Sequence, residues 1–168
     1  MFEINIGLSE YEKNSKFNTR TAVRGIIMKN GKILMVHTNK GDYKFPGGGV
    51  KFGESITNAL KREVEEETGY IVKDIREKAG VAFQRNHDKY EKDAIFEMKS
   101  IYFFCTVSDS ISEQNLDQYE KEQEFEPKWI SVEEALKNNI SIIKNQNNNP
   151  WLEREIEVLK KLNENIIK

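Results

Sequence analysis

The amino-acid sequence predicts a single domain of the α/β (α+β) class over residues 1–168. Three observations support this prediction. The pair Asn30-Gly31 lies between two apolar runs, which is a strong signal for a β-hairpin. Residues 55–69 have the apolar spacing of an amphipathic helix. Residues 98–107 are rich in aromatic side chains, which are typical of a buried strand.

The first third of the chain contains the expected hairpin. Residues 1–18 are mixed and polar, and we expect an N-terminal arm or strand there. Apolar residues dominate 21–28 and recur in 32–38, which predicts two strands joined by the Asn-Gly turn. A loop with three consecutive glycines, 45–49, follows them. Glycine allows the backbone to adopt positive φ and to approach a phosphate or an ion closely, although such a run is more often an ordinary turn.

The middle of the chain alternates between expected strands and charged segments. Residues 71–84 read as one or two strands, with Gly80 as a β-bulge. Residues 85–93 form a charged loop that could overhang a site. The aromatic strand 98–107 comes next, and a polar, acidic loop over 108–125 follows it.

Two helices are expected after a short strand at 128–130. The first begins at Ser131 with a capping box and is expected to end near Asn138. The second extends over 150–166, with Asn149 as its N-cap and proline at its first position. Its apolar stripe is expected to pack on the domain.

The helix between Ser55 and Gly69 carries carboxylates on a side that should face protein. Glu63, Glu66 and Glu67 stand at i, i+3 and i+4, so they share one face. Unpaired carboxylates are costly there, because burial disfavours their charged form. A Mg²⁺ or Mn²⁺ ion would remove the conflict, since such cations prefer oxygen ligands. Taken alone, however, a run of charges is more often a solvated helix face.

The residues around this helix complete a longer pattern. With U for a bulky aliphatic residue, the pattern is G-x5-E-x7-R-E-U-x-E-E-x-G-U. It is matched by Gly48, Glu54, Arg62, Glu63, Val64, Glu66, Glu67, Gly69 and Tyr70. Tyrosine at the last position is the one departure. The chain therefore resembles the Nudix hydrolase superfamily, and its order of elements resembles the Nudix α/β/α sandwich, in which a mixed sheet lies between helices.

This resemblance implies a role for each matching residue. Glu63, Glu66 and Glu67 correspond to the acids that bind metal and take part in catalysis. The carbonyl of Gly47, just before the motif, often joins the metal shell in family members. Structural support of the site is implied for Gly48, Glu54, Arg62 and Gly69. In particular, a guanidinium is a rigid fork suited to a two-point contact with a carboxylate.

Further site residues are expected outside the motif. Family members often supply another acid from the loop before a tryptophan that corresponds to Trp129. This loop contains Glu120, Glu122, Glu124 and Glu126, and we favour Glu122 or Glu124. The basic residues Arg24, Lys44 and Arg85 are candidates for substrate contacts, although basic side chains near a loop are more often solvated or structural.

The resemblance implies a pyrophosphohydrolase that depends on Mg²⁺ or Mn²⁺. Its small-molecule substrate would be a nucleoside diphosphate linked to another group, cleaved by a metal-activated water that attacks phosphorus. One alternative is a non-catalytic ligand sensor, which usually lacks some of the acids. Another is an isoprenoid-diphosphate isomerase, which usually needs a catalytic cysteine. Cys105 instead lies in an aromatic run, where cysteine usually acts as a small hydrophobe.

Composition narrows the expected partners. The net charge of −2 gives no basic field for general nucleic-acid binding, and no DNA-binding segment is evident. No apolar run approaches membrane-spanning length, and the N-terminus has no signal-peptide pattern. We therefore expect a cytoplasmic protein, and the family resemblance is compatible with a homodimer.

Overall fold

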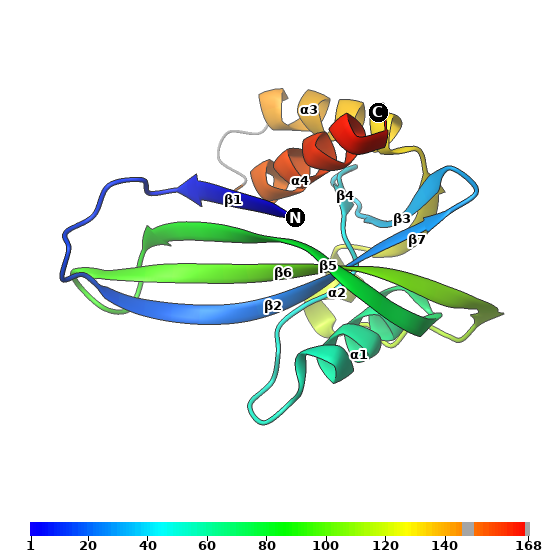
Figure 1. The fold of residues 1–168 in the computed structure, drawn as a ribbon, viewed down its shortest axis with the longest axis horizontal. Helices are drawn as coiled ribbons and strands as arrows, with labels where there is room; N and C mark the ends of the chain where they lie inside the picture. Colours follow the sequence, from blue (N-terminus) through cyan, green and yellow to red (C-terminus); the bar gives the residue numbers. More distant parts are fainter. Residues whose placement is uncertain (146–149, 167–168) are drawn as a thin grey trace.

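A computed structural model of the chain describes residues 1–145 and 150–166. A mixed sheet of seven strands lies between helices, as Figure 1 shows. Helix α1 (Ile56–Thr68) covers one face of the sheet, while α3 (Val132–Asn145) and α4 (Pro150–Ile166) lie on the other side. This arrangement confirms the expected α/β/α sandwich. No described helix is long and apolar enough to cross a membrane.

The sheet combines parallel and antiparallel pairs. Its strands are β1 (Phe2–Gly7), β2 (Lys16–Lys29), β3 (Lys32–His37), β4 (Tyr43–Lys44), β5 (Tyr70–His87), β6 (Ala94–Ile111) and β7 (Glu126–Ile130). The order is β1-β5-β6-β2-β3-β4, and β7 pairs with β3. The pairs β1–β5 and β2–β6 are parallel, and the other pairs are antiparallel.

The predicted hairpin between β2 and β3 is confirmed. Asn30 and Gly31 have φ values of 51° and 74°, as a two-residue turn of type I′ requires. Strand β2 begins at Lys16, earlier than predicted, because its polar first half pairs with the start of β6.

Strand β5 is longer than its sequence indicated. It is one strand that runs to His87, so the charged loop expected over 85–93 is confined to the residues after His87. The extension is stabilised by cross-strand pairing, because Arg85 of β5 lies opposite Glu97 of β6 and forms an ion pair with it. The expected irregularity at Gly80 is present, since the register shifts between Lys78 and Gly80.

The prediction that α3 ends near Asn138 is wrong, because this helix continues to Asn145. Asparagine often ends helices, but Asn139 is fully buried and faces strand β4. Its side chain accepts a hydrogen bond from the Tyr43 N–H and donates one to the Tyr43 carbonyl, both at 2.9 Å. The asparagine therefore satisfies strand backbone in the core without interrupting the helix.

The helix ends otherwise follow their sequence signals. Ser55 caps α1, and Gly69 ends it in the left-handed conformation with φ of 73°. Ser131 and Glu134 form the expected reciprocal capping contacts before α3. The predicted N-cap of α4, Asn149, lies outside the described residues.

Alternate residues of β2 contribute to two separate cores. Val23 and Ile27 pack with Val64 of α1, whereas Ile26 packs with Leu159 of α4. This follows from the two-residue period of a strand. Burial of one stripe of α1 fixes the rotation of the helix, and this rotation decides where its glutamates point.

Candidate metal and diphosphate site

Helix α1 presents two glutamates, one turn apart, to a glycine loop. Glu63 is 8% exposed and Glu67 is 5% exposed, so both lie in the protein rather than on a solvated face. The N–H of Gly47 donates to Oε2 of Glu67 at 2.7 Å. The carboxylate of Glu63 lies directly against Gly48, where no side chain intervenes.

The glycine loop is held against β2 by its backbone. The N–H of Val23 donates to the Gly48 carbonyl, and that of Gly25 donates to the Pro46 carbonyl, both at 2.9 Å. Gly47 has φ of 136°, and a Cβ atom there would lie 2.1 Å from the Val23 carbonyl oxygen. Only glycine suits this position, because both the conformation and the close approach exclude a side chain.

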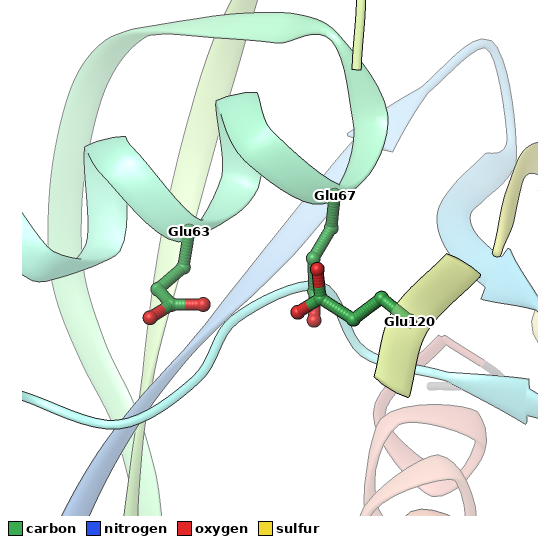
Figure 2. Close-up of side chains that lie close together, drawn as sticks. All are labelled: Glu63, Glu67 and Glu120. Atoms are coloured by element: carbon green, nitrogen blue, oxygen red, sulfur yellow. The ribbon is translucent and has the colours of Figure 1, made fainter. Parts of the chain in front are cut away.

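A third carboxylate comes from helix α2 (Gln118–Glu122), within the segment expected to be a loop. One oxygen from each of Glu63, Glu67 and Glu120 lies within 4.8 Å of the others. Figure 2 shows Glu63 and Glu67 projecting from successive turns of α1 and Glu120 reaching towards Glu67 from α2. We call these three residues the carboxylate cluster.

The structure therefore brings Glu120 to the cluster, and not Glu122 or Glu124. Glu122 is exposed and accepts a hydrogen bond from Gln118, while Glu124 is exposed beyond the helix end, with φ of 53°. A sequence signal for α2 existed. Asp117 and Glu120 form a capping box, a Ser/Thr/Asp-x-x-Glu spacing that marks helix starts.

Arg62 joins the loop to the acidic helix. Its Nε and Nη2 atoms each donate to one oxygen of Glu54 at 2.8 Å, which is the expected two-point contact. Its Nη1 donates to Glu63 at 2.6 Å and to Glu66 at 3.0 Å. Glu66 thus shares this guanidinium with Glu63, but it is not among the three acids whose oxygens converge. One guanidinium positions Glu63 and neutralises part of the charge on α1.

The electrostatics of the cluster are unfavourable for three bare carboxylates. Burial raises the pKa of Glu67 to about 8, and the charges of Glu120 and Glu63 also raise it, while Arg24 and the Gly47 N–H act in the opposite direction. Burial and neighbouring acids likewise raise the pKa of Glu120. By contrast, hydrogen bonds from Arg62 lower the pKa of Glu54 to about 2. The contact between Arg62 and Glu54 is therefore stable as an ion pair, whereas Glu67 and Glu120 form no ion pair among the described residues.

This cluster suits a small divalent cation. Its donors are all carboxylate oxygens, which Mg²⁺ and Mn²⁺ prefer, and the added charge would remove the repulsion between them. Ligands of one Mg²⁺ ion lie at most about 4.2 Å apart, given a metal–oxygen distance of about 2.1 Å. The observed limit of 4.8 Å thus requires only a small closing movement of side chains. Glu63, Glu67 and Glu120 are the residues that could hold the ion.

The expected carbonyl ligand, that of Gly47, already accepts a hydrogen bond from Arg24 Nη1. A carbonyl oxygen has two lone pairs, so this contact leaves one for a cation. Arg24 Nη1 also donates to the Phe45 carbonyl at 3.2 Å. Arg24 therefore orients the loop from the strand beneath it.

A cavity of about 530 Å³ opens beside the cluster. Glu63, Glu67 and Glu120 line it together with four basic residues, Arg20, Arg24, Lys44 and Arg154. Its size is within the range of small-molecule sites. A second cavity, also about 530 Å³, lies on the side of Arg62 and Glu66 and shares Glu63 and Glu120 with the first. Two of the three acids of the carboxylate cluster, Glu63 and Glu120, thus border both cavities.

The three predicted substrate contacts differ in their positions. Arg24 and Lys44 line the cavity, and Lys44 also lies 5.1 Å from the centre of the Phe125 ring. Arg85 instead donates to Glu97 at 2.8 Å and to Asn5 at 2.7 Å. Strand register places Arg85 on the sheet face opposite Arg24. The structure does not bring Arg85 to the cluster.

Comparison with known proteins agrees with this geometry. A family model described as the NUDIX domain matches residues 18–152. The chain belongs to the NUDIX family. The match includes the glycine loop, α1 and α2, so every residue of the carboxylate cluster lies inside the NUDIX domain.

Individual relatives are similar over shorter stretches. An ADP-ribose pyrophosphatase of Methanocaldococcus jannaschii is 46% identical over 56 residues, which cover 31% of this chain and 33% of the relative. An 8-oxo-dGTP diphosphatase of Buchnera aphidicola is 46% identical over 52 residues, or 28% of this chain and 40% of the relative. The similarity thus spans well under half of each curated relative.

A solved NUDIX hydrolase of Nitrosomonas europaea shares the fold. It superimposes with a TM-score of 0.59 at 21% identity, covering 83% of this chain and 87% of that one. This likeness extends the fold assignment over most of the molecule.

Proposed function

We propose that this NUDIX protein is a pyrophosphohydrolase that uses Mg²⁺ or Mn²⁺ to cleave the diphosphate of a nucleotide-type substrate. One observation supports this most directly: Glu63, Glu67 and Glu120 converge, with oxygens within 4.8 Å, at the wall of a cavity that also contains basic residues. A cation bound by these carboxylates, together with the neighbouring Arg and Lys side chains, would provide the positive charge that a negatively charged diphosphate requires.

The protein's own residues orient the reacting groups. Arg20 and Lys44 are placed to contact phosphate oxygens from the cavity wall, and Arg62 and Gly48 keep Glu63 in position. A divalent ion held by Glu63, Glu67 and Glu120 would supply charge neutralisation and would lower the pKa of a bound water molecule. Glu120 is our candidate for the base that accepts the proton from this water, because it is less buried than Glu67. Attack at phosphorus then releases a nucleoside monophosphate and a second phosphate product.

The buried, apolar surroundings of Cys105 do not support the isomerase alternative. Cys105 belongs to the core between the sheet and α1, packed with Val23 and Val64. Burial raises its pKa to about 12, so the thiolate needed for nucleophilic or acid–base chemistry is scarce near neutral pH.

The substrate class is narrowed only in part by the relatives. One is named for ADP-ribose, an adenine compound, and the other for 8-oxo-dGTP, a guanine compound. Both compounds contain a nucleoside attached to at least two linked phosphates, a diphosphate in ADP-ribose and a triphosphate in 8-oxo-dGTP. We infer that the shared diphosphate is the reactive group here, and that the base must be determined separately.

Turnover in ¹⁸O-labelled water tests the proposal. ADP-ribose, 8-oxo-dGTP, a dinucleoside polyphosphate and a sugar nucleotide are incubated with Mg²⁺, and the products are identified by mass spectrometry. We expect at least one substrate to yield a nucleoside monophosphate, with one ¹⁸O atom in a phosphate product, and chelation of the metal to stop the reaction. Absence of turnover across the panel would contradict the proposal and favour the ligand-sensor alternative.

A further inference from the structure

Glu120 reaches the carboxylate cluster from a helix that has little support of its own, as Figure 2 illustrates. Helix α2 is short, and none of its described residues, Gln118–Glu122, is buried. A helix of this length is unstable alone in water, and the burial of an apolar face usually supplies the missing stability. Because α2 lacks such burial, hydrogen bonds at its two ends must hold Glu120 in position.

The segment before α2 closes the end of α1. The last carbonyls of a helix have no partner within the helix. Here the Asn115 N–H donates to the Glu66 carbonyl at 2.9 Å. The side-chain Nε2 of Gln114 donates to the next carbonyl, that of Glu67. The segment is thus fixed to the last turn of α1 just before the capping box of α2 begins at Asp117.

Gln114 also bridges to the far end of α2. Its Nε2 carries two hydrogens, and the second is donated to the Phe125 carbonyl at 3.0 Å. The Phe125 N–H in turn donates to the Glu120 carbonyl at 3.2 Å. A chain of hydrogen bonds therefore runs from the backbone of Glu67, through Gln114 and Phe125, to the backbone of Glu120.

The capping box of α2 orients the Glu120 side chain. Oε2 of Glu120 accepts a hydrogen bond from the Asp117 N–H at 2.8 Å. The direction of this carboxylate is thus set by the start of α2. Its distance from Glu67 then depends on how the start of α2 is held against the end of α1.

Other contacts hold α2 against a different part of the protein. The Asn39 N–H donates to the Gln123 carbonyl at 2.9 Å, and Lys44 Nζ donates to Gln123 Oε1 at 3.0 Å. These contacts join the end of α2 to β4 and to the residues before it. Gln114 instead joins α2 to α1, so it is the side chain among these that fixes α2 relative to the glutamates of α1.

We propose that Gln114 is a positioning residue that holds Glu120 in the carboxylate cluster, an inference that rests on the diphosphate hydrolysis proposed above. Gln114 does not line either cavity beside the cluster. It acts through Glu120, because its amide fixes the start of α2 against the end of α1. Loss of its two N–H groups releases α2 from α1, so Glu120 leaves the cluster while Glu63 and Glu67 stay in place.

Replacement of Gln114 by methionine tests the proposal. Gln114→Met keeps the length of the side chain and removes both N–H groups. We expect it to lower kcat about 10- to 100-fold with little change in KM, since a small misplacement of a reacting group has an effect of this size. Gln118→Met is the matched control, because Gln118 is exposed and donates to Glu122 within α2. This control should behave like the wild type.

Mn²⁺ binding gives a readout that does not depend on turnover. In calorimetric titrations Gln114→Met should weaken Mn²⁺ binding about 10- to 100-fold, the range seen when outer-shell partners of a metal are removed. A double-mutant cycle separates positioning from a general loss of stability. In a Glu120→Gln background, Gln114→Met should have little further effect on Mn²⁺ affinity or kcat. A defect of the same size in both backgrounds would overturn the proposal, because Gln114 would then act through another group.

Exchange of the Gln114 side-chain amide tests the bridge in the wild type. NMR of the metal-free protein should show both Nε2 protons of Gln114 exchanging with water far more slowly than those of Gln118. Equally fast exchange at the two side chains would show that the bridge does not persist in solution, and it would overturn the proposal. This measurement decides the matter even if Gln114→Met does not fold.

The two proposals fail separately. If the wild type hydrolyses diphosphates and Gln114→Met matches it in kcat and Mn²⁺ affinity, the positioning role is overturned and the hydrolase is not. If no diphosphate is hydrolysed, but Gln114→Met weakens Mn²⁺ binding and Gln118→Met does not, the positioning role stands and the hydrolase proposal falls.

Discussion

The carboxylate of Glu63 occupies the space that a side chain at Gly48 would need. A Cβ atom added to Gly48 would lie 2.3 Å from Glu63 Oε2. At the neighbouring Gly47 the obstacle is different, because an added Cβ would lie 2.1 Å from the backbone oxygen of Val23. A flexible carboxylate can move aside, but strand backbone cannot. Gly47 is therefore required by the fold, and Gly48 by the position of Glu63.

Alanine at these two positions should accordingly give different defects. Gly48→Ala should fold with nearly wild-type thermal stability but lower kcat at least about tenfold, since Glu63 is displaced from the cluster. Gly47→Ala should lose about 1–3 kcal/mol or more of unfolding free energy through backbone strain alone. Thermal unfolding and turnover of each variant provide the comparison. Full activity in a folded Gly48→Ala protein would show that Glu63 need not lie where it does.

Helix α2 offers a matched pair of glutamates for testing the third carboxylate. Glu120→Gln removes an acid of the cluster, whereas Glu122→Gln changes an exposed acid two residues away. If Glu120 accepts the proton of the attacking water, Glu120→Gln should reduce kcat about 10²- to 10⁴-fold. Glu122→Gln should leave kcat as it is. The reverse order of effects would mean that α2 takes another position during turnover.

Chemical modification of Cys105 tests the claim that this residue takes no part in catalysis. Because burial raises its pKa to about 12, the native thiol should react with iodoacetamide far more slowly than in denaturant. Cys105→Ser should retain turnover, since the residue only packs in the core. Rapid labelling of the native protein, accompanied by loss of activity, would contradict this account and revive the isomerase alternative.

Much of the fold was predictable because its signals are local. The hairpin follows from the Asn30-Gly31 turn, and α1 follows from the cap at Ser55 and the glycine at its end. The contact of Arg62 with Glu54 follows from the spacing of a sequence motif that one helix and its loop contain.

The parts that escaped prediction depend on contacts between distant segments. Asn139 continues α3 because it pairs with Tyr43, which lies far away in sequence. Arg85 lies on a strand because Glu97 is its cross-strand partner. The sequence does not single out Glu120, because several acids occur in one segment and only the short helix that begins after Asp117 distinguishes it.

The central claim is that Glu63, Glu67 and Glu120 together hold a divalent cation. It is tested most directly by calorimetric titration of Mn²⁺ into the wild type, Glu67→Gln and Glu65→Gln. Glu65 lies on the same helix but is exposed, so its variant controls for the loss of one charge. We expect Glu67→Gln to weaken Mn²⁺ binding by at least about 10- to 100-fold, the range seen when even outer-shell partners of a metal are removed, and Glu65→Gln to bind like the wild type. Equal Mn²⁺ affinity in the wild type and a folded Glu67→Gln protein would contradict the account.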